Sequence, residues 1–301
     1  MKSRYFSFIA LTMVLAMLIL STGCGVRING KDYELFKASE NEEKNNIFSG
    51  IVSGIGSGIG SELSDNQEIL EDKQDGEQFV VSNNAGNIKF KKSLTSQIEI
   101  KADKIVRGAS IENKQSILDN MNIKLERSDK VINVVLKTKD GNDFWEWQKD
   151  NFKVFQVTIN FDISLPEGVN VIEASTGAGN VDIDDVVAKL ALKTGAGNID
   201  VQGVSALGDN LLSTGAGNIS FDGNVNDISS FDISTGVGNV KFEVPENTKM
   251  SLEADTGVGV LSGSFIKTED NNKFYFVGDV NGGGPSVKLN TGVGNVKADK
   301  N

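Results

Sequence analysis

Apolar and polar residues alternate along much of the chain from residue 79 onward. Residues 97–101, 131–136 and 154–165 alternate with a period of two, which predicts half-buried strands. Residues 109–121 space their apolar side chains as one face of a helix does, and they predict one short helix. Leu-Pro-Glu-Gly at 165–168 predicts a turn. The pattern therefore indicates an all-β protein that contains one short helix.

A short motif recurs through the C-terminal part of the chain. Thr-Gly-Ala/Val-Gly occurs six times, and the first glycines of successive copies are 18, 20, 21, 21 and 35 residues apart. The copies begin at Thr176, Thr194, Thr214, Thr235, Thr256 and Thr291. A period near twenty with a fixed glycine pair is typical of stacked repeats, so residues 171–301 are predicted to form a β-solenoid. Residues 82–88 are a degenerate early copy, with Asn84 at the first glycine, which favours one continuous β-architecture.

The motif predicts a corner in each coil of the solenoid. Leu192, Thr194 and Ala196 share one face of an alternating strand, and the phase of the alternation changes at Gly197-Asn198. Glycine's freedom at positive φ suits such a corner. We therefore expect the Ala or Val between the two glycines to face a crowded interior.

An asparagine follows the second glycine in five of the six copies, and Val260 takes its place in the other. The five are Asn180, Asn198, Asn218, Asn239 and Asn295. If the coils stack at about 4.8 Å, these amides come into register and can hydrogen-bond along the stack. We interpret them as a structural ladder in preference to a ligand-binding set. Lys297, Asp299 and Lys300 are expected to protect an open edge at the last coil.

The N-terminal residues predict export. Lys2 and Arg4 precede an apolar run at 6–20, which is short for a membrane-spanning helix, and 1–23 is predicted to be a signal peptide. Cys24, the single cysteine, follows small residues as in a bacterial lipoprotein signal, which predicts lipidation of Cys24 and a location on the outer face of the cytoplasmic membrane. An uncleaved anchor or a thiol that pairs with another chain are the alternatives.

Residues 24–76 are rich in Gly, Ser, Asn and acids, and they predict a membrane-proximal stalk or linker. Ile or Leu recurs every fourth residue over 47–63, which leaves a membrane-associated helix open there. Residues 77–170 are expected to form a β-rich N-terminal part that leads into the solenoid.

Composition excludes several classes of chemistry. The chain has no histidine and one cysteine, so triads that need an imidazole and zinc sites built from imidazole or thiolate are excluded in their usual forms. The net charge is −11, and it becomes −13 without residues 1–23, which contain two basic residues and no acid. A charge of that sign disfavours nucleic acid as a partner. We expect a protein that is not an enzyme and has no cofactor.

Two groups of residues are candidate sites. Asp182, Asp184 and Asp200 would bring like charges together on adjacent coils, so they are candidates for a cation site. Trp145 and Trp147 lie at alternating positions in a segment expected to be an acidic loop, where one ring could contact a partner or both could cap the core. The long step before Thr291 is either a binding insertion or an irregular capping coil, and the sequence leaves both open.

The Thr-Gly-x-Gly-Asn repeats, the turn at 163–166 and the closing Gly-rich coil resemble a bacterial family of β-strand-repeat proteins named "putative adhesin". The resemblance covers residues 77–301. It implies a β-helix-like fold on proteins associated with the cell envelope, and it supplies no catalytic residue.

These observations predict a cell-surface lipoprotein that serves as an adhesin-like, non-enzymatic binding or scaffold module. Its expected partner, besides the membrane, is an envelope protein or a cell-wall polymer. A regulatory or structural component of an envelope-stress pathway is the alternative, followed by a polysaccharide-active β-helix enzyme.

Overall fold

The structure is a computed structural model, and it describes residues 26–28, 31–33, 62–73, 77–108, 110–152, 156–267 and 274–301. The chain divides into two units, 1–53 and 54–301. In the first unit, β1 (Val26–Ile28) and β2 (Lys31–Tyr33) pair as an antiparallel hairpin. The predictions for residues 1–23, Cys24 and most of 47–63 lie outside the described residues. No helix in the described part of the chain is long and apolar enough to cross a membrane.

The second unit is an all-β body, as the alternation predicts, and its strands join one hydrogen-bonded sheet. The strands are β3 (Leu63–Asp72), β4 (Glu77–Ala85), β5 (Ile88–Lys92), β6 (Gln97–Arg107), β7 (Asn122–Ser128), β8 (Val131–Lys137), β9 (Gln156–Leu165), β10 (Val169–Ala178), β11 (Val181–Asp184), β12 (Val187–Ala196), β13 (Ile199–Ala216), β14 (Ile219–Val237), β15 (Val240–Val244), β16 (Met250–Val258), β17 (Leu261–Ser262), β18 (Tyr275–Val280), β19 (Ser286–Val293) and β20 (Val296–Lys300). The described helices are α3 (Ile111–Asn120) and α4 (Phe144–Asn151).

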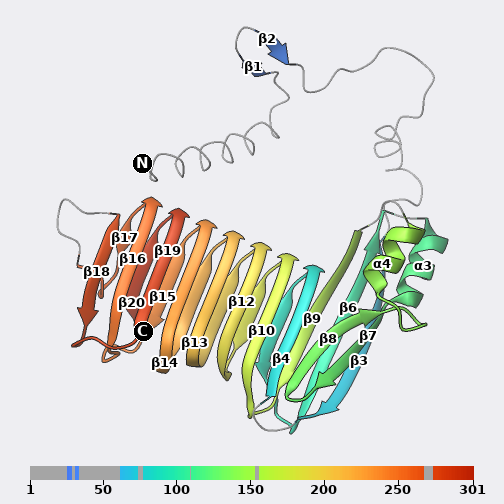
Figure 1. The fold of residues 1–301 in the computed structure, drawn as a ribbon, viewed down its shortest axis with the longest axis horizontal. Coiled ribbons are helices and arrows are strands. Elements are labelled where there is room, and N and C mark those ends of the chain that lie inside the picture. The colour runs from blue at the N-terminus through green and yellow to red at the C-terminus, as the bar shows by residue number, and fades with distance from the viewer. Residues whose placement is uncertain are drawn as a thin grey trace. The chain divides into compact units, whose positions relative to one another are not determined.

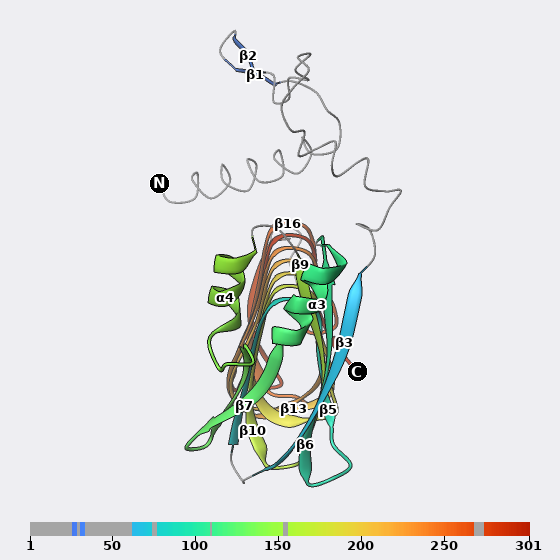
Figure 2. The ribbon, with the colours of Figure 1, turned by 90° about the vertical axis from the view of Figure 1, so that its right-hand side faces the viewer.

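The sheet curves around the core, so that the unit has two faces with the core between them (Figures 1 and 2). The first face runs β7, β8, β4, β10, β12, β13, β14, β19, β16 and β18. The second face runs β3, β6, β9, β5, β11, β13, β14, β15, β20 and β17. The long strands β13 and β14 contribute to both faces and so connect them.

Copies of the repeat pair in parallel and in register. Thr176 lies opposite Thr194, and Thr194 lies opposite Thr214. The degenerate copy joins the same stack, since Asn83 lies opposite Thr176. Each copy stands at the corner where the chain leaves the first face for the second. The predicted register of the repeats is therefore confirmed.

Glycine allows the corners to stack this closely. A Cβ on Gly195 would come within 2.4 Å of the Gly177 carbonyl oxygen, and one on Gly197, whose φ is +153°, within 2.0 Å of the Gly179 carbonyl oxygen. The residue between the two glycines points outward: Ala196 is exposed, and so is Val258. The expectation of an inward Ala or Val is therefore wrong, because the alternation already changes phase at the first glycine.

The order of the last repeats differs from their order in sequence. Thr291 of β19 lies opposite both Thr235 of β14 and Thr256 of β16, so the sixth copy is inserted between the fourth and the fifth. On the second face, β20 lies between β15 and β17 in the same way. The expectation that charged residues 297–300 protect an open edge is wrong, since β20 has a neighbour on each side.

Two helices occupy the N-terminal end of the stack, where one was predicted (Figure 2). α3 matches the predicted helix, and its Ser110 side chain accepts a hydrogen bond from the Asn113 amide. α4 occupies the segment expected to be a loop, and Asp143 caps it by accepting from the Glu146 amide. Strand β3 lies inside the range expected to be linker and pairs antiparallel with β6 along its whole length.

Candidate functional site

The asparagines at the corners form a continuous chain of hydrogen bonds along the stack. Each side-chain oxygen accepts from the backbone N–H of the equivalent residue in the next repeat: Asn180 from the Asn198 amide at 2.9 Å, and Asn198 from the Asn218 amide at 2.8 Å. The chain continues through Asn239 and Asn295, then ends at the amide of Val260. These amides bond to backbone N–H groups, and they therefore act in the structure of the stack.

The motif threonines form a second chain of the same kind. Thr194 donates to the Gly179 carbonyl at 2.8 Å, and Thr214 donates to the Gly197 carbonyl at 2.9 Å. Both bonds join one repeat to its neighbour, so the threonine hydroxyl and the glycine carbonyl each have a hydrogen-bond partner within the stack. The Thr-Gly-x-Gly motif is thus explained by contacts between repeats.

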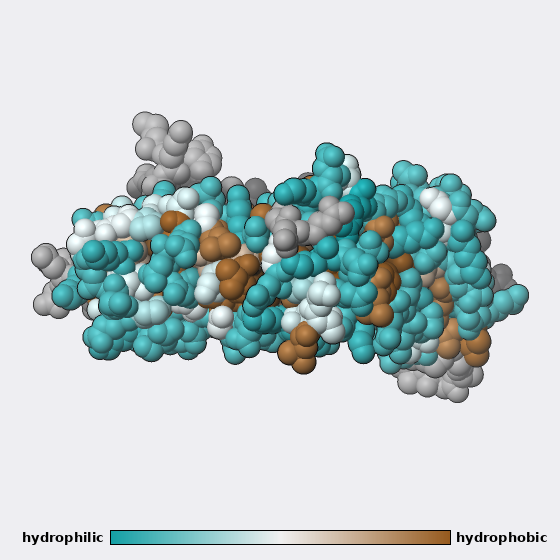
Figure 3. Space-filling model, turned by 90° about the horizontal axis from the view of Figure 1, so that it is seen from below, coloured by the Kyte–Doolittle hydropathy of each residue, from teal (hydrophilic) through white to brown (hydrophobic). Residues whose placement is uncertain are grey.

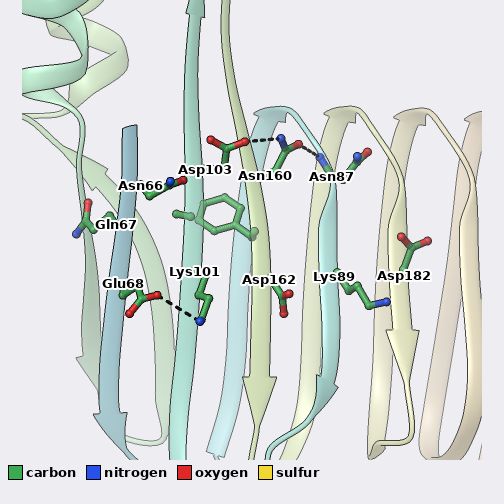
Figure 4. Close-up of a pocket in the computed structure, with 12 residues that line it drawn as sticks. Asn66, Gln67, Glu68, Asn87, Lys89, Lys101, Asp103, Asn160, Asp162 and Asp182 are labelled. Carbon is green, nitrogen blue, oxygen red and sulfur yellow. Dashed lines mark hydrogen bonds and ion pairs between the residues drawn. The ribbon is translucent and has the colours of Figure 1, made fainter. Parts of the chain in front are cut away.

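A groove opens on the second face, where the antiparallel strands β3, β6 and β9 meet the parallel strands β5 and β11. Its volume is about 510 Å³, within the range of sites for small molecules. Figure 4 shows its polar side chains on the five strands. The lining residues are Asn66, Gln67, Glu68, Asn87, Lys89, Lys101, Ala102, Asp103, Asn160, Phe161, Asp162 and Asp182.

Amides line one level of this groove (Figure 4). Asn160 donates to Asp103 at 3.4 Å, and its oxygen accepts from the Asn87 amide at 3.0 Å. Asn160 therefore begins the chain of corner asparagines and also faces the groove. Phe161 and Ala102, opposite each other in register, are buried behind this level and give the groove an apolar floor.

Charged side chains of alternating sign line the groove two residues further along the same strands. Lys101 pairs with Glu68 at 3.2 Å, and Lys91, just outside the lining set, pairs with Asp162 at 2.8 Å. Lys89 lies between Asp162 and Asp182 in register, but its ammonium group pairs with Asp184 at 3.1 Å. That bond raises the pKa of Lys89, so the side chain stays charged at neutral pH.

Asp182 lies at the end of the groove, and Asp200, outside the lining set, stands beside it in register, as the repeat predicts. Burial, and next the charge of Asp200, raise the pKa of Asp182, and the positive charge of Lys89 offsets part of this shift. Gln202 donates to Asp200 at 3.0 Å, whereas Asp182 has no hydrogen bond or ion pair within the described residues. In the part of the chain that the structure describes, no three acidic or cysteine side chains gather closely enough to hold a metal ion. The cation site at Asp182, Asp184 and Asp200 stays a prediction.

Trp145 and Trp147 lie on α4, away from the groove. Both rings are partly buried against the core, and both contact Phe144, with ring centroids 5.2 Å and 5.7 Å from it. Trp147 also contacts Phe152 at 5.5 Å. Their packing shows a role at the end of the core, and their contact with a partner stays a prediction.

The groove residues were not predicted from the sequence as a set, because they come from five strands in an order that the chain does not follow. The signal available was the outward position of Lys101 on a predicted strand. It becomes specific only when the neighbours of each strand are known.

Comparisons with known proteins give similarities of structure alone. No family model matches the chain, and no curated protein matches its sequence. A "putative cell adhesion protein" of Clostridium sporogenes is 16% identical, with a TM-score of 0.45 over 79% of this chain and 100% of that one. A "putative adhesin" of Bacteroides fragilis is 13% identical, with a TM-score of 0.36 over 79% of this chain and 97% of that one. A "putative lipid binding protein" of Parabacteroides distasonis is 11% identical, with a TM-score of 0.32 over 79% and 96%.

Proposed function

We propose that this chain is a non-enzymatic, adhesin-like surface protein of the bacterial envelope that binds a hydroxyl-rich polymer of the cell wall. The observation that carries the proposal is the polar groove on the second face. Its amides and paired charges offer both donors and acceptors, which are the groups that bind hydroxyls. A polymer suits a groove that crosses five strands.

The surroundings of the groove support a polar ligand. Asn66, Glu68, Asn87, Lys89 and Lys101 are all exposed. Figure 3, a view of the molecule from below, shows hydrophilic residues over most of that side and hydrophobic ones in separate small groups. An apolar partner would need a continuous apolar patch.

The rest of the proposal concerns architecture and location. We infer that the in-register parallel repeats are a β-solenoid, which holds the groove on a rigid support. Lipidation of Cys24 would keep the protein on the outer face of the cytoplasmic membrane, where cell-wall polymers are within reach. The absence of histidine in the sequence supports binding over catalysis.

The test measures binding of the protein to purified peptidoglycan fragments and to a teichoic polymer by calorimetry. Lys101→Glu replaces a hydrogen-bond donor of the groove by a second acid beside Glu68 and is expected to weaken binding roughly tenfold, since the ligand's hydroxyls lose a charged donor. Lys92→Glu is the matched control, because Lys92 pairs with Glu167 outside the groove and the change in charge is identical.

Equal loss of affinity in the two variants, or no binding of either polymer by the unsubstituted protein, would contradict the proposal. Release of reducing sugar from the polymer would show an enzyme in place of a binding module.

A further inference from the structure

We propose that β18 pairs edge to edge with β18 of a second copy of this chain, so that the protein forms a two-fold symmetric dimer. β18 is the last strand of the first face at the C-terminal end of the stack (Figure 1). The first faces of the two copies would thereby join in one continuous sheet. This dimer is independent of the groove and of its ligand, and it goes beyond the proposed function.

The edge strands of the described sheet differ in how they are protected against such pairing. At the N-terminal end, β3 is rich in acids, and β7 carries three charged side chains. The Gln67 side chain also occupies the edge of β7, because it donates to the Ile123 carbonyl at 2.6 Å and accepts from the Ile123 amide at 3.0 Å. At the C-terminal end, β17 has only two residues, whereas β18 has six and a single charge, Asp279. β18 is therefore the edge that lacks the usual protection.

The pairing of β18 with β16 shows which backbone groups point to the open side. The Thr256 amide donates to the Phe274 carbonyl at 2.9 Å, and these two residues continue the register of the two strands. In an antiparallel pair, residues alternate between bonding the neighbouring strand and facing away from it. The N–H and C=O groups of Tyr275, Val277 and Asp279 therefore point away from β16. No strand pairs with them on that side within the described residues.

These groups fix the register of a symmetric pair. With Val277 opposite Val277 of the second copy, Tyr275 lies opposite Asp279, and all three positions can exchange both backbone hydrogen bonds. Any other register leaves at least one of the three positions unpaired. In this register two valines meet and each carboxylate faces a neutral ring, so no like charges stand directly opposite each other. On the inner side, Phe276 would lie opposite Gly278, which has no side chain and leaves room for the ring.

The outer side chains of this edge suit the addition of a strand. Tyr275 is 44% exposed and Val277 is 61% exposed. Aromatic and β-branched side chains beside unpaired backbone groups favour strand pairing. A second copy fits better than a strand of another protein, because a two-fold interface requires one patch that complements itself, as this edge does.

Sedimentation velocity of the full chain at several protein concentrations tests the dimer. Detergent is present so that the apolar run at 6–20 does not itself cause association. The unsubstituted protein is expected to show a concentration-dependent equilibrium between monomer and dimer. Val277→Lys would place two ammonium groups opposite each other and is expected to weaken the dimer at least about tenfold.

The matched control is Val187→Lys. Val187 begins β12, away from this edge, and is 55% exposed, and the change in charge is identical. This variant should dimerise as the unsubstituted protein does. If it weakened the dimer as much as Val277→Lys, the effect would come from charge alone and the proposed pairing would be overturned.

A mixture of two variants tests the two-fold register itself. Val277→Glu alone is also expected to lose the dimer, whereas an equimolar mixture of Val277→Lys and Val277→Glu should regain it, because opposite charges then face each other. Misfolding of either variant could not produce that recovery. A protein that stays monomeric, a dimer that Val277→Lys leaves intact, or a mixture that does not associate would overturn the proposed pairing. The calorimetry of the groove would stand in each case.

Discussion

At the scale of single residues, the side chain of each corner asparagine links its repeat to the next one by a hydrogen bond. Its oxygen accepts from the backbone N–H of the next repeat, and the oxygen of Asn218 also accepts from the side-chain amide of Asn239 at 3.2 Å. Val260 belongs to the repeat at the end of the stack, and its backbone N–H donates the last bond of the chain to the side-chain oxygen of Asn295. Val260, which replaces the asparagine in one copy of the motif, thus lies where no further described repeat follows in the stack.

We expect Asn198→Ala to lower the free energy of unfolding by about 1 kcal/mol, the usual net value of one hydrogen bond. Val260→Asn should change it little, because no described repeat lies beyond that residue to donate to the new oxygen. Denaturant titrations of the two variants measure this difference. Equal effects would show that the asparagines do not act through the chain of bonds.

Asp182 makes stability depend on pH. Its pKa is raised above the ordinary 3.8, so the folded state holds the proton more tightly than the unfolded state does. Stability therefore falls as pH rises from about 4 through the raised pKa of the folded state. Asp182→Asn is expected to melt at a higher temperature than the unsubstituted protein at neutral pH and at a similar temperature below pH 4. A variant that is less stable at neutral pH would contradict this sign.

At the scale of elements, two ion pairs, each with one buried partner, close the N-terminal end of the stack. Glu77 on β4 is fully buried and pairs with Arg127 on β7 at 2.6 Å. Lys104 on β6 is buried and pairs with Asp65 on β3 at 2.7 Å. Each pair joins an edge strand to the second or third strand of its face, so the edges are held by charge as well as by backbone hydrogen bonds.

Arg127→Met is expected to destabilise the protein by roughly 3–5 kcal/mol, because the Glu77 carboxylate stays buried without its guanidinium. Lys92→Met removes an exposed pair and should cost far less. Combining Arg127→Met with Glu77→Leu should recover part of the loss. Thermal unfolding of the three variants checks this, and a double variant as unstable as Arg127→Met would contradict it.

The sequence predicted the elements whose signal is local. Alternation identified β6, β8 and β9, and the repeat identified the register of β10, β12 and β13. It missed α4, although Asp143 and Glu146 have the spacing of an N-cap and its partner, because the eight-residue helix shows little periodicity. It missed β3 because the acids and amides of that strand read as linker, and pairing with β6 decides its structure.

The groove lay beyond prediction for a related reason. Each of its side chains is an ordinary outward residue of a strand, and only the order β3, β6, β9, β5, β11 brings them together. That order mixes antiparallel and parallel pairing, which spacing along the chain does not record. Asp182 and Asp200 were found because they belong to adjacent repeats.

At the scale of the whole unit, the inserted sixth repeat makes the C-terminal strands part of the interior of the stack. A chain that ends at residue 285 lacks β19 and β20, so β14, β15, β16 and β17 each lose a partner strand. We expect it to bind an apolar dye such as ANS and to unfold without a single cooperative transition. Val277→Ser in the full chain is the control, since Val277 is 61% exposed on β18 and should be near neutral. A cooperative, dye-free truncated chain would contradict the expectation.

The same insertion limits how such a protein can change in length over evolution. A repeat duplicated at the C-terminus would find no unpaired strand edge next to β20, since β20 has neighbours on both sides. Between β10 and β14, by contrast, each repeat pairs with the ones just before and after it, and one more could be added without changing the order. Relatives of different length are therefore expected to vary in this middle segment, while both ends keep their number of strands.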